Sequence, residues 1–259
     1  MQKTLLFKAL ITALLAALLQ IPIRMIHSTV GERQERQDAV RNDIAASFAG
    51  EQQIAGPVLV LPYLELYSET VWANEPVAGG GTQRVRRERQ RKYNGRLILL
   101  PELAELDLEA GTDFKRRGLF KVLVYGLSGT IQGRFELPAE LRVDRKAEDS
   151  RITWGQPFLS LGLTDTRGLS RAPSLQWDGA EREFAQGTEL GASLPNGLHA
   201  KLPRIEPGRA RTIPFGIDLG LRGTESVSFE PLAATTRVAL ASGGGVATGV
   251  YGVPLRNSS

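Results

Sequence analysis

The apolar residues of the chain are most concentrated near its start, in residues 5–26. The run LLFKALITALLAALLQIPIRMI is interrupted by few polar side chains, chiefly Lys8, Thr12 and Gln20. As a helix that rises about 1.5 Å per residue, it would be roughly 33 Å long, enough to cross a hydrocarbon layer of about 30 Å. The pattern therefore predicts a transmembrane anchor over residues 1–27.

A cleaved signal peptide and a buried core helix are the alternatives for this segment. A signal peptide ends in a cleavage site made of small residues, whereas Leu19 is followed by QIPIRMI, in which the residues are large. An uncleaved anchor is therefore favoured. The flanking charges do not settle its orientation, because basic residues are abundant on both sides and a large domain that follows can cross the membrane regardless of charge.

Residues 28–50 combine alternating acids and bases with apolar residues at helical spacing. Val30, Val40, Ile44 and Phe48 fall on roughly one face of a helix. This pattern predicts a juxtamembrane helix that leaves the bilayer. A solvated stalk is favoured over a helix that binds a partner.

From Gly56 onward the apolar period changes from helical to two. Short apolar or alternating runs, bounded by Gly, Pro, Asn or Asp, occupy residues 58–66, 96–101, 119–127, 133–138, 157–165, 212–221, 226–232 and 235–241. They predict a mainly β domain over residues 51–242, sandwich-like and antiparallel. Within it, Asp178-Gly179 suits the two-residue turn of a β-hairpin.

A short repeat is visible inside this domain. Residues 126–136 contain Gly-Leu-x-Gly-Thr-x4-Phe-Glu, and residues 220–230 repeat these types at identical spacing. The repeat indicates either a duplicated strand–turn–strand unit or a chance match. Unrelated topological positions for the two copies would exclude duplication.

The amino-acid composition excludes several kinds of site. The chain has no cysteine, which excludes disulfides and thiolate metal sites. Its net charge of +4 is modest, and no nucleic-acid-binding motif accompanies it, so no nucleic-acid partner is expected.

No catalytic, cofactor-binding or metal-binding residues are predicted. His27 and His199 have no partner nearby in the sequence, so we expect them to be surface or packing residues. Glu102 and Glu105 are expected to face water on a loop or an edge strand. No phosphate-binding loop, nucleophile elbow or zinc-protease motif is present.

A basic run, VRRERQRK at residues 85–92, is the candidate binding surface. Its charges protect an exposed strand edge from aggregation, or they contact anionic headgroups or an acidic partner. The residues proposed for such contact are Arg84, Arg86, Arg87, Arg89, Arg91 and Lys92.

Three stretches carry a resemblance to a known family: IPIRMI with GERQERQDAV and QQIAGPVLVLPY; LLPELAELDLEAGTDFKRRGLFKVLVYGLSGTIQGRFELP; and WGQPFLSLGLTDTRGL with PFGIDLGLRGTESVSFEPL. Over residues 3–241 the sequence resembles the CreD family of bacterial inner-membrane proteins. The pair Gly56-Pro57 and the segment Arg116-Arg117-Gly118 are the most specific elements of the match.

The resemblance implies a cytoplasmic N-terminus, a periplasmic β domain and a role in envelope integrity or the envelope stress response. We therefore expect a non-enzymatic protein whose partners are the lipid bilayer and envelope proteins or anionic lipid. The alternative is an envelope hydrolase with an Asp/Glu site assembled in the β domain. The family continues into further membrane helices, which are not present in this sequence.

The C-terminal sequence GGGVATGVYGVPLRNSS, residues 243–259, has little apolar periodicity and many glycines. Glycine loses much conformational entropy on ordering, so this tail is expected to be disordered or loosely packed. In the resembled family, the sequence at this point is expected to continue into more strand and a membrane helix. The glycine-rich tail therefore indicates a truncated or frame-shifted chain. We expect an unpaired strand edge near Val238.

Overall fold

The computed structural model describes residues 20, 33–36 and 39, and residues 49–252 except 78, 79, 118, 119, 225 and 244. Apart from Gln20, the predicted anchor lies outside the described residues. Of the predicted juxtamembrane helix, residues 33–36 and Ala39 are helical, and most of the rest is outside the described part. Among the described residues, no helix has the length and apolarity needed to cross a bilayer.

The described body is mainly β and consists of two sheets, as predicted. The first sheet contains β1 (Gln52–Val77), β2 (Gly81–Leu99), β5 (Arg151–Trp154), β6 (Phe158–Leu163), β9 (Ala185–Gln186), β10 (Gly197–Lys201) and β12 (Val227–Glu230). The second contains β3 (Leu103–Arg117), β4 (Phe120–Leu137), β7 (Ser174–Trp177), β8 (Ala180–Glu183), β11 (Arg211–Thr224), β13 (Thr235–Ser242) and β14 (Gly245–Gly252). Two short 3-10 helices are η1 (Thr166–Gly168) and η2 (Gly191–Ser193).

The strand order of the first sheet is β12-β1-β6-β10-β9, with β2 and β5 also paired to β1. The order of the second is β14-β13-β3-β4-β11-β7-β8. The expectation of a purely antiparallel array is wrong at two ladders, because β12 runs parallel to β1 and β13 runs parallel to β3. Both late strands return beside strands that are far away in sequence, and such long connections permit a parallel approach.

The main core lies between the two sheets. It joins Leu59 and Leu161 of the first sheet to Ile131, Phe135 and Ile217 of the second. The odd-numbered residues from 213 to 221 are buried along β11, as the alternating sequence predicts. All six residues of β6 are buried, because a second apolar cluster covers the other face of the first sheet.

The predicted hairpin at Asp178-Gly179 is confirmed. Strands β7 and β8 pair in register up to Trp177 and Ala180, so these two residues form the turn. Both have positive φ, 51° at Asp178 and 79° at Gly179, as a type I′ turn requires. Arg211 on β11 donates a hydrogen bond to the Asp178 carboxylate at 2.9 Å, which holds the turn against the second sheet.

The duplication suggested by the short repeat is wrong. The first copy, residues 126–136, lies entirely within β4, whereas the second, residues 220–230, leaves β11, turns and continues into β12 in the other sheet. The two copies meet where β4 and β11 pair antiparallel, with Leu127 opposite Leu221. The two copies therefore do not belong to one repeated supersecondary unit.

The prediction for the C-terminal tail is wrong over residues 245–252. These residues form β14, which pairs with β13 along its whole length. Val238 is paired on both sides, with Gly249 of β14 and Leu106 of β3, so the expected unpaired edge does not exist there. Backbone hydrogen bonding to an existing strand does not require apolar side chains, which is why a glycine-rich segment can join the sheet. Residues 253–259 lie outside the described part.

Candidate interaction surface

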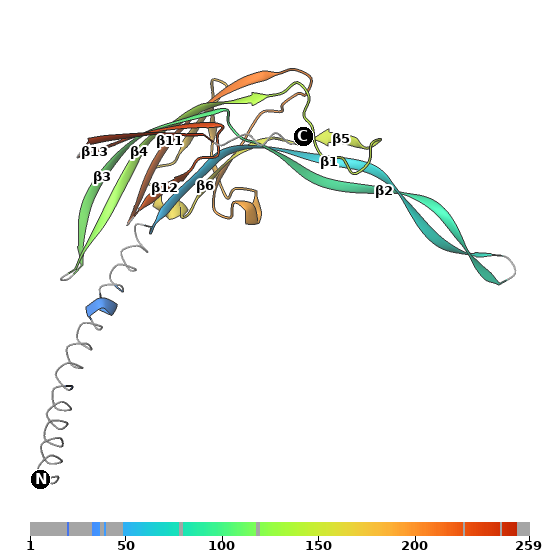
Figure 1. Cartoon of the computed structure of the whole chain (residues 1–259), viewed down its shortest axis with the longest axis horizontal. Helices are drawn as coiled ribbons and strands as arrows, with labels where there is room; N and C mark the ends of the chain where they lie inside the picture. The colour runs from blue at the N-terminus through green and yellow to red at the C-terminus, as the bar shows by residue number, and fades with distance from the viewer. Residues whose placement is uncertain are drawn as a thin grey trace, which may run out of the picture.

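Strands β1 and β2 form a long hairpin that projects from the body (Figure 1). On its other side β1 pairs with β5 as far as Leu66. From Tyr67 to Val77, β1 has no described strand partner except β2. We call this two-stranded segment, residues 67–77 and 81–91, the arm. Its 11 residues per strand correspond to about 36 Å at roughly 3.3 Å per residue.

The register of the arm divides the predicted basic run between two faces, because residues directly opposite each other in a hairpin share a face. Trp72 lies opposite Arg86, and Tyr67 lies opposite Arg91. The Trp72 face carries Arg84, Arg86 and Lys92, and the Tyr67 face carries Arg87, Arg89 and Arg91. The six predicted contact residues therefore do not form one patch.

The Trp72 face places an exposed aromatic ring among cations. Trp72 is 62% exposed. The guanidinium of Arg84 lies 5.8 Å from the centre of its ring, a cation–π arrangement. Directly opposite Trp72, Arg86 donates a hydrogen bond to the Thr70 hydroxyl at 3.5 Å. Trp and Arg dominate the binding energy of many protein interfaces, so this face has the chemistry of a docking site.

The Tyr67 face is more self-contained. Arg91 forms an ion pair of 2.8 Å with Glu69, and both side chains are about half exposed. Between these charges and the end of the arm, Val71, Ala73 and Val85 are partly buried. This face therefore holds the two strands together, although an exposed ion pair contributes little free energy by itself.

Aromatic rings fix the base of the arm where β1, β2 and β5 meet. The ring of Tyr63 packs edge-on against Trp154, with centroids 5.6 Å apart, and lies 6.3 Å from Tyr93. A Cβ at Gly95, opposite Tyr63, would come within 2.1 Å of the Tyr63 ring, so this ring occupies the space above the glycine. Lys146 lies 4.5 Å over the ring of Tyr93.

Glu65 is a buried carboxylate beside this cluster, with no exposed surface. Its Oε1 accepts a hydrogen bond of 2.6 Å from the backbone N–H of Lys146. Burial raises the pKa of Glu65, but the nearby Ser150 hydroxyl, the backbone N–H groups of Lys146 and Ala147 and the charge of Lys146 together lower it below its ordinary value. Within the described part, Ser150 Oγ and Glu65 Oε2 are buried without a hydrogen-bond partner in the geometry.

An open groove of about 730 Å³ lies where β1, β2 and β5 meet. Pro62, Leu64, Arg96, Thr153 and Glu189 are among the residues that line it. The aromatic cluster at the base of the arm, Tyr63, Tyr93 and Trp154, also lines it. Among the described residues that line it, Glu189 is the one acid, so the described part of the groove does not bring two carboxylates together.

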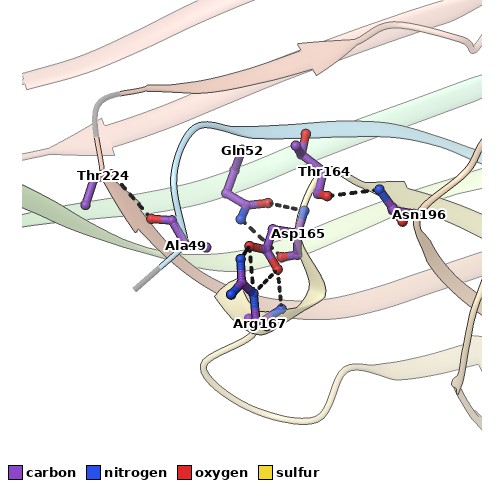
Figure 2. A network of polar contacts seen from close by, with 7 residues as sticks. All are labelled: Ala49, Gln52, Thr164, Asp165, Arg167, Asn196 and Thr224. Carbon is purple, nitrogen blue, oxygen red and sulfur yellow. Dashed lines mark hydrogen bonds and ion pairs between the residues drawn. The ribbon is translucent and has the colours of Figure 1, made fainter. Parts of the chain in front are cut away.

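A polar network anchors the point where the chain joins the β body (Figure 2). The side chain of Gln52, 1% exposed, donates to the backbone oxygen of Asp165 at 3.1 Å and accepts from its N–H at 3.4 Å. Asp165 caps η1 and pairs with Arg167, which lowers the pKa of its carboxyl. Three residues before the start of β1, the Ala49 oxygen accepts hydrogen bonds from Thr224.

The remaining candidates from the sequence have structural roles. His199 is buried, its Nδ1 lies 2.7 Å from the Gly187 oxygen, and it packs edge-on against Phe158, as expected of a packing histidine. His27 lies outside the described residues. Glu105 faces water as predicted, but on β3, an internal strand, where it pairs with Arg237 at 2.6 Å. In the described part of the chain, no group of three or more His, Cys, Asp or Glu residues could hold a metal ion.

These features define a class of molecule: a two-sheet β protein that presents a long, exposed, basic hairpin. Its sequence matches the family described as inner membrane protein CreD over residues 4–244. Because that match covers most of the chain, the protein belongs to the CreD family of inner membrane proteins, and the resemblance seen in the sequence is confirmed.

The chain is 27% identical over 229 residues to inner membrane protein CreD of Escherichia coli (strain K12). This alignment covers 87% of the chain and 46% of the E. coli protein, so the chain spans about half the length of this curated relative. No solved structure matches the chain.

Sequence reasoning identified the basic residues of the arm but not the arm itself. The apolar alternation stops near Leu66, whereas β1 continues to Val77 through the polar segment SETVWANEPV. The signals that could have located the hairpin are Thr70, Val71 and Trp72, which favour strands, and the glycines that precede the basic run.

Proposed function

We propose that this protein is a non-enzymatic component of the bacterial inner membrane that supports envelope integrity or the envelope stress response. Residues 1–27 anchor it, its N-terminus is cytoplasmic, and its β body lies in the periplasm. Membership of the CreD family supports the membrane location, and the family resemblance supports the orientation and the role.

Within this function the arm is the docking element for an acidic envelope protein. The single observation that carries this assignment is the Trp72 face. There an exposed Trp lies opposite Arg86 and under the guanidinium of Arg84, on a hairpin with no described strand partner in the body beyond its base. A protein is favoured over lipid because Trp72 lies 18 residues along β1 from Ile54, roughly 60 Å at 3.3 Å per residue, away from the end that leads to the anchor.

Deletion of the gene tests the proposed function. Cells without the protein should become more sensitive to detergent, and the wild-type chain should restore resistance. Unchanged sensitivity of the deleted strain, in both rich medium and envelope stress, would show that the protein does not support the envelope.

A photo-crosslinking amino acid at position 72 or 71 of the full chain tests the docking element. Position 72 should give an adduct that disappears when Arg84 and Arg86 are replaced by Gln and weakens with added salt, because charge steers such contacts. Position 71, on the Tyr67 face, is the matched control and should give little adduct. Equal adducts from both positions, unaffected by the Arg84→Gln and Arg86→Gln changes, would contradict the assignment.

The lipid interpretation of the arm is tested separately. Arg86, Arg87, Arg89 and Arg91 are replaced by Gln, and the binding of the chain to vesicles that contain phosphatidylglycerol is measured. We expect unchanged binding, whereas a large loss would assign the arm to lipid.

The alternative, an envelope hydrolase, needs two carboxylates that act together. Among the described residues, Glu65 is the one buried acid, and it is held by backbone N–H groups under the segment that contains Lys146. No observation therefore favours this alternative.

A further inference from the structure

A second hairpin, formed by β3 and β4, projects from the body at the end opposite the arm (Figure 1). On β4 the pairing with β11 stops at Val124, and on β3 the pairing with β13 stops at Ala110. Beyond these points the described residues of the two strands pair only with each other. We call residues 114–117 and 120–123 the β3–β4 tip.

One face of the tip combines two exposed apolar side chains with two cations. Phe114 lies directly opposite Leu123, and Arg116 lies directly opposite Lys121 two residues further out. Phe114 is 61% exposed and Leu123 is 41% exposed, and both basic residues are exposed as well. Because positions two apart on a strand share a face, these four side chains form a single surface.

The opposite face of the tip has a different character. Lys115 forms an ion pair of 2.7 Å with Asp113, so its charge is locally balanced. Val122, opposite Lys115, is buried. The exposed apolar and basic groups are therefore concentrated on the Phe114 face.

This arrangement suits an anionic bilayer surface. Aromatic and aliphatic side chains insert at the boundary between headgroups and acyl chains, while Arg and Lys next to them reach the phosphates. Without such a surface, two cations directly opposite each other on a hairpin repel, and two large apolar side chains stay in water.

The tip also lies near the point where the chain joins the body, which docking on the anchoring membrane requires. Thr224, the last residue of β11, bonds to Ala49, where the chain joins the body, and it pairs with Val124 of β4. Lys121 is three residues beyond Val124, which is about 10 Å further along the strand. The tip therefore extends past Ala49 and the start of β1, where the described body begins.

We propose that the β3–β4 tip docks on the anionic surface of the membrane in which the chain is anchored. Phe114 and Leu123 enter the interfacial region, and Arg116 and Lys121 bind lipid phosphates. This inference rests on the proposed anchor and orientation. It gives the body two distinct contacts, with lipid at the tip and with protein at the arm.

A single fluorescent label tests the proposal. The chain contains no cysteine, so Leu123→Cys creates a unique attachment site on the full-length protein. The labelled chain is reconstituted in phosphatidylcholine vesicles, with or without phosphatidylglycerol, that carry a headgroup-attached quencher. We expect strong quenching that increases with phosphatidylglycerol, and weak quenching of a Thr70→Cys label on the arm.

Charge variants of the labelled chain test the role of the cations. A basic residue near an anionic surface raises the ratio of docked to undocked chains by about 5-fold, so Arg116→Gln with Lys121→Gln should lower this ratio by roughly 25-fold. Lys115→Gln, on the opposite face and already paired with Asp113, is the matched control and should change it by less than about 2-fold.

The outcomes distinguish failure of the proposed anchor from failure of the proposed docking of the tip. A chain that floats with the vesicles but shows no quenching at Leu123→Cys, or at a second label at Phe114→Cys, refutes docking of the tip and leaves the anchor intact. Quenching that does not depend on phosphatidylglycerol or on Arg116 and Lys121 refutes recognition of anionic lipid. A chain that does not float refutes the anchor and, with it, this inference.

Discussion

At the scale of single residues, Glu65 is the charged group whose protonation should affect stability. The carboxylate is buried, and its pKa is lower in the folded protein than in the unfolded chain. A depressed folded pKa stabilises the protein above the unfolded value, near 4.3, and this contribution is lost as the pH falls through the folded pKa. Glu65 therefore contributes to the loss of stability in acid.

We predict that Glu65→Gln lowers the thermal midpoint at pH 7 and that its difference from the wild type shrinks as the pH falls below about 4. Gln can still accept the hydrogen bond from Lys146, but it lacks the charge that the surrounding N–H groups stabilise. Thermal unfolding between pH 3 and 8 measures the effect. Glu69→Gln is the control, because Glu69 is half exposed in the arm and should shift little. A Glu65→Gln difference that is constant with pH would contradict the role of the charge.

At the scale of elements, the junction between the start of β1 and η1 depends on one side chain. Gln52 satisfies both the N–H and the carbonyl of Asp165, and its amide also lies against Gly168, where a Cβ would be 2.6 Å from Gln52 Nε2. Tyr125 of β4 closes the junction from the second sheet, donating a hydrogen bond of 2.8 Å to the Ser226 oxygen. Burial raises the pKa of this tyrosine to about 12, so it stays a donor throughout the physiological range.

Gln52→Leu should reduce the free energy of unfolding by about 1–3 kcal/mol, because it leaves the backbone groups of Asp165 without this partner. Gln53→Leu is the matched control: the neighbouring side chain is exposed and makes only a weak contact of 3.4 Å with Glu230. Chemical denaturation of both variants checks the prediction. Equal effects of the two changes would mean that the Gln52 network does not stabilise the junction.

Elements with period-two apolar patterns could be predicted from the sequence, and those stabilised by pairing alone could not. The predicted run at residues 212–221 corresponds to β11, because its buried face consists of alternate apolar residues. At the start of β3 the sequence predicts that Glu102 and Glu105 face water on a loop or an edge strand, whereas β3 begins at Leu103 and is an internal strand. The internal position of β3 depends on partners that are distant in sequence, β4 and β13, which local pattern does not encode.

The same limit applies to the candidate site. The basic character of residues 84–92 could be predicted from composition, but the separation of Arg84 and Arg86 from Arg87 depends on hairpin register. The Phe114 face could not be predicted either, because Phe114 and Leu123 are brought together only by the pairing of β3 with β4.

At the scale of the whole molecule, the two hairpins differ in their relation to the core. The main core is formed by residues of both sheets within the body, and no described residue of the arm belongs to it. The arm's described residues are exposed or only partly buried. The arm therefore contributes length and surface, while the body determines stability.

Replacement of residues 69–89 by a short glycine-containing turn between Ser68 and Gln90 tests this separation. The aromatic base at Tyr63, Tyr93 and Trp154 stays intact, and closing a shorter loop costs slightly less entropy, so the free energy of unfolding should change by about 1 kcal/mol or less. Thermal unfolding and denaturant titration of the shortened chain measure this quantity.

The shortened chain should also remain attached to membranes and keep the Leu123→Cys label close to the lipid, because the β3–β4 tip lies at the other end of the body. It should fail to restore detergent resistance to cells that lack the gene, since Trp72, Arg84 and Arg86 are removed with the arm. Full restoration would show that the arm is not the docking element. A loss of stability of several kcal/mol would show instead that the arm supports the fold, which would remove the basis for treating it as a separate functional element.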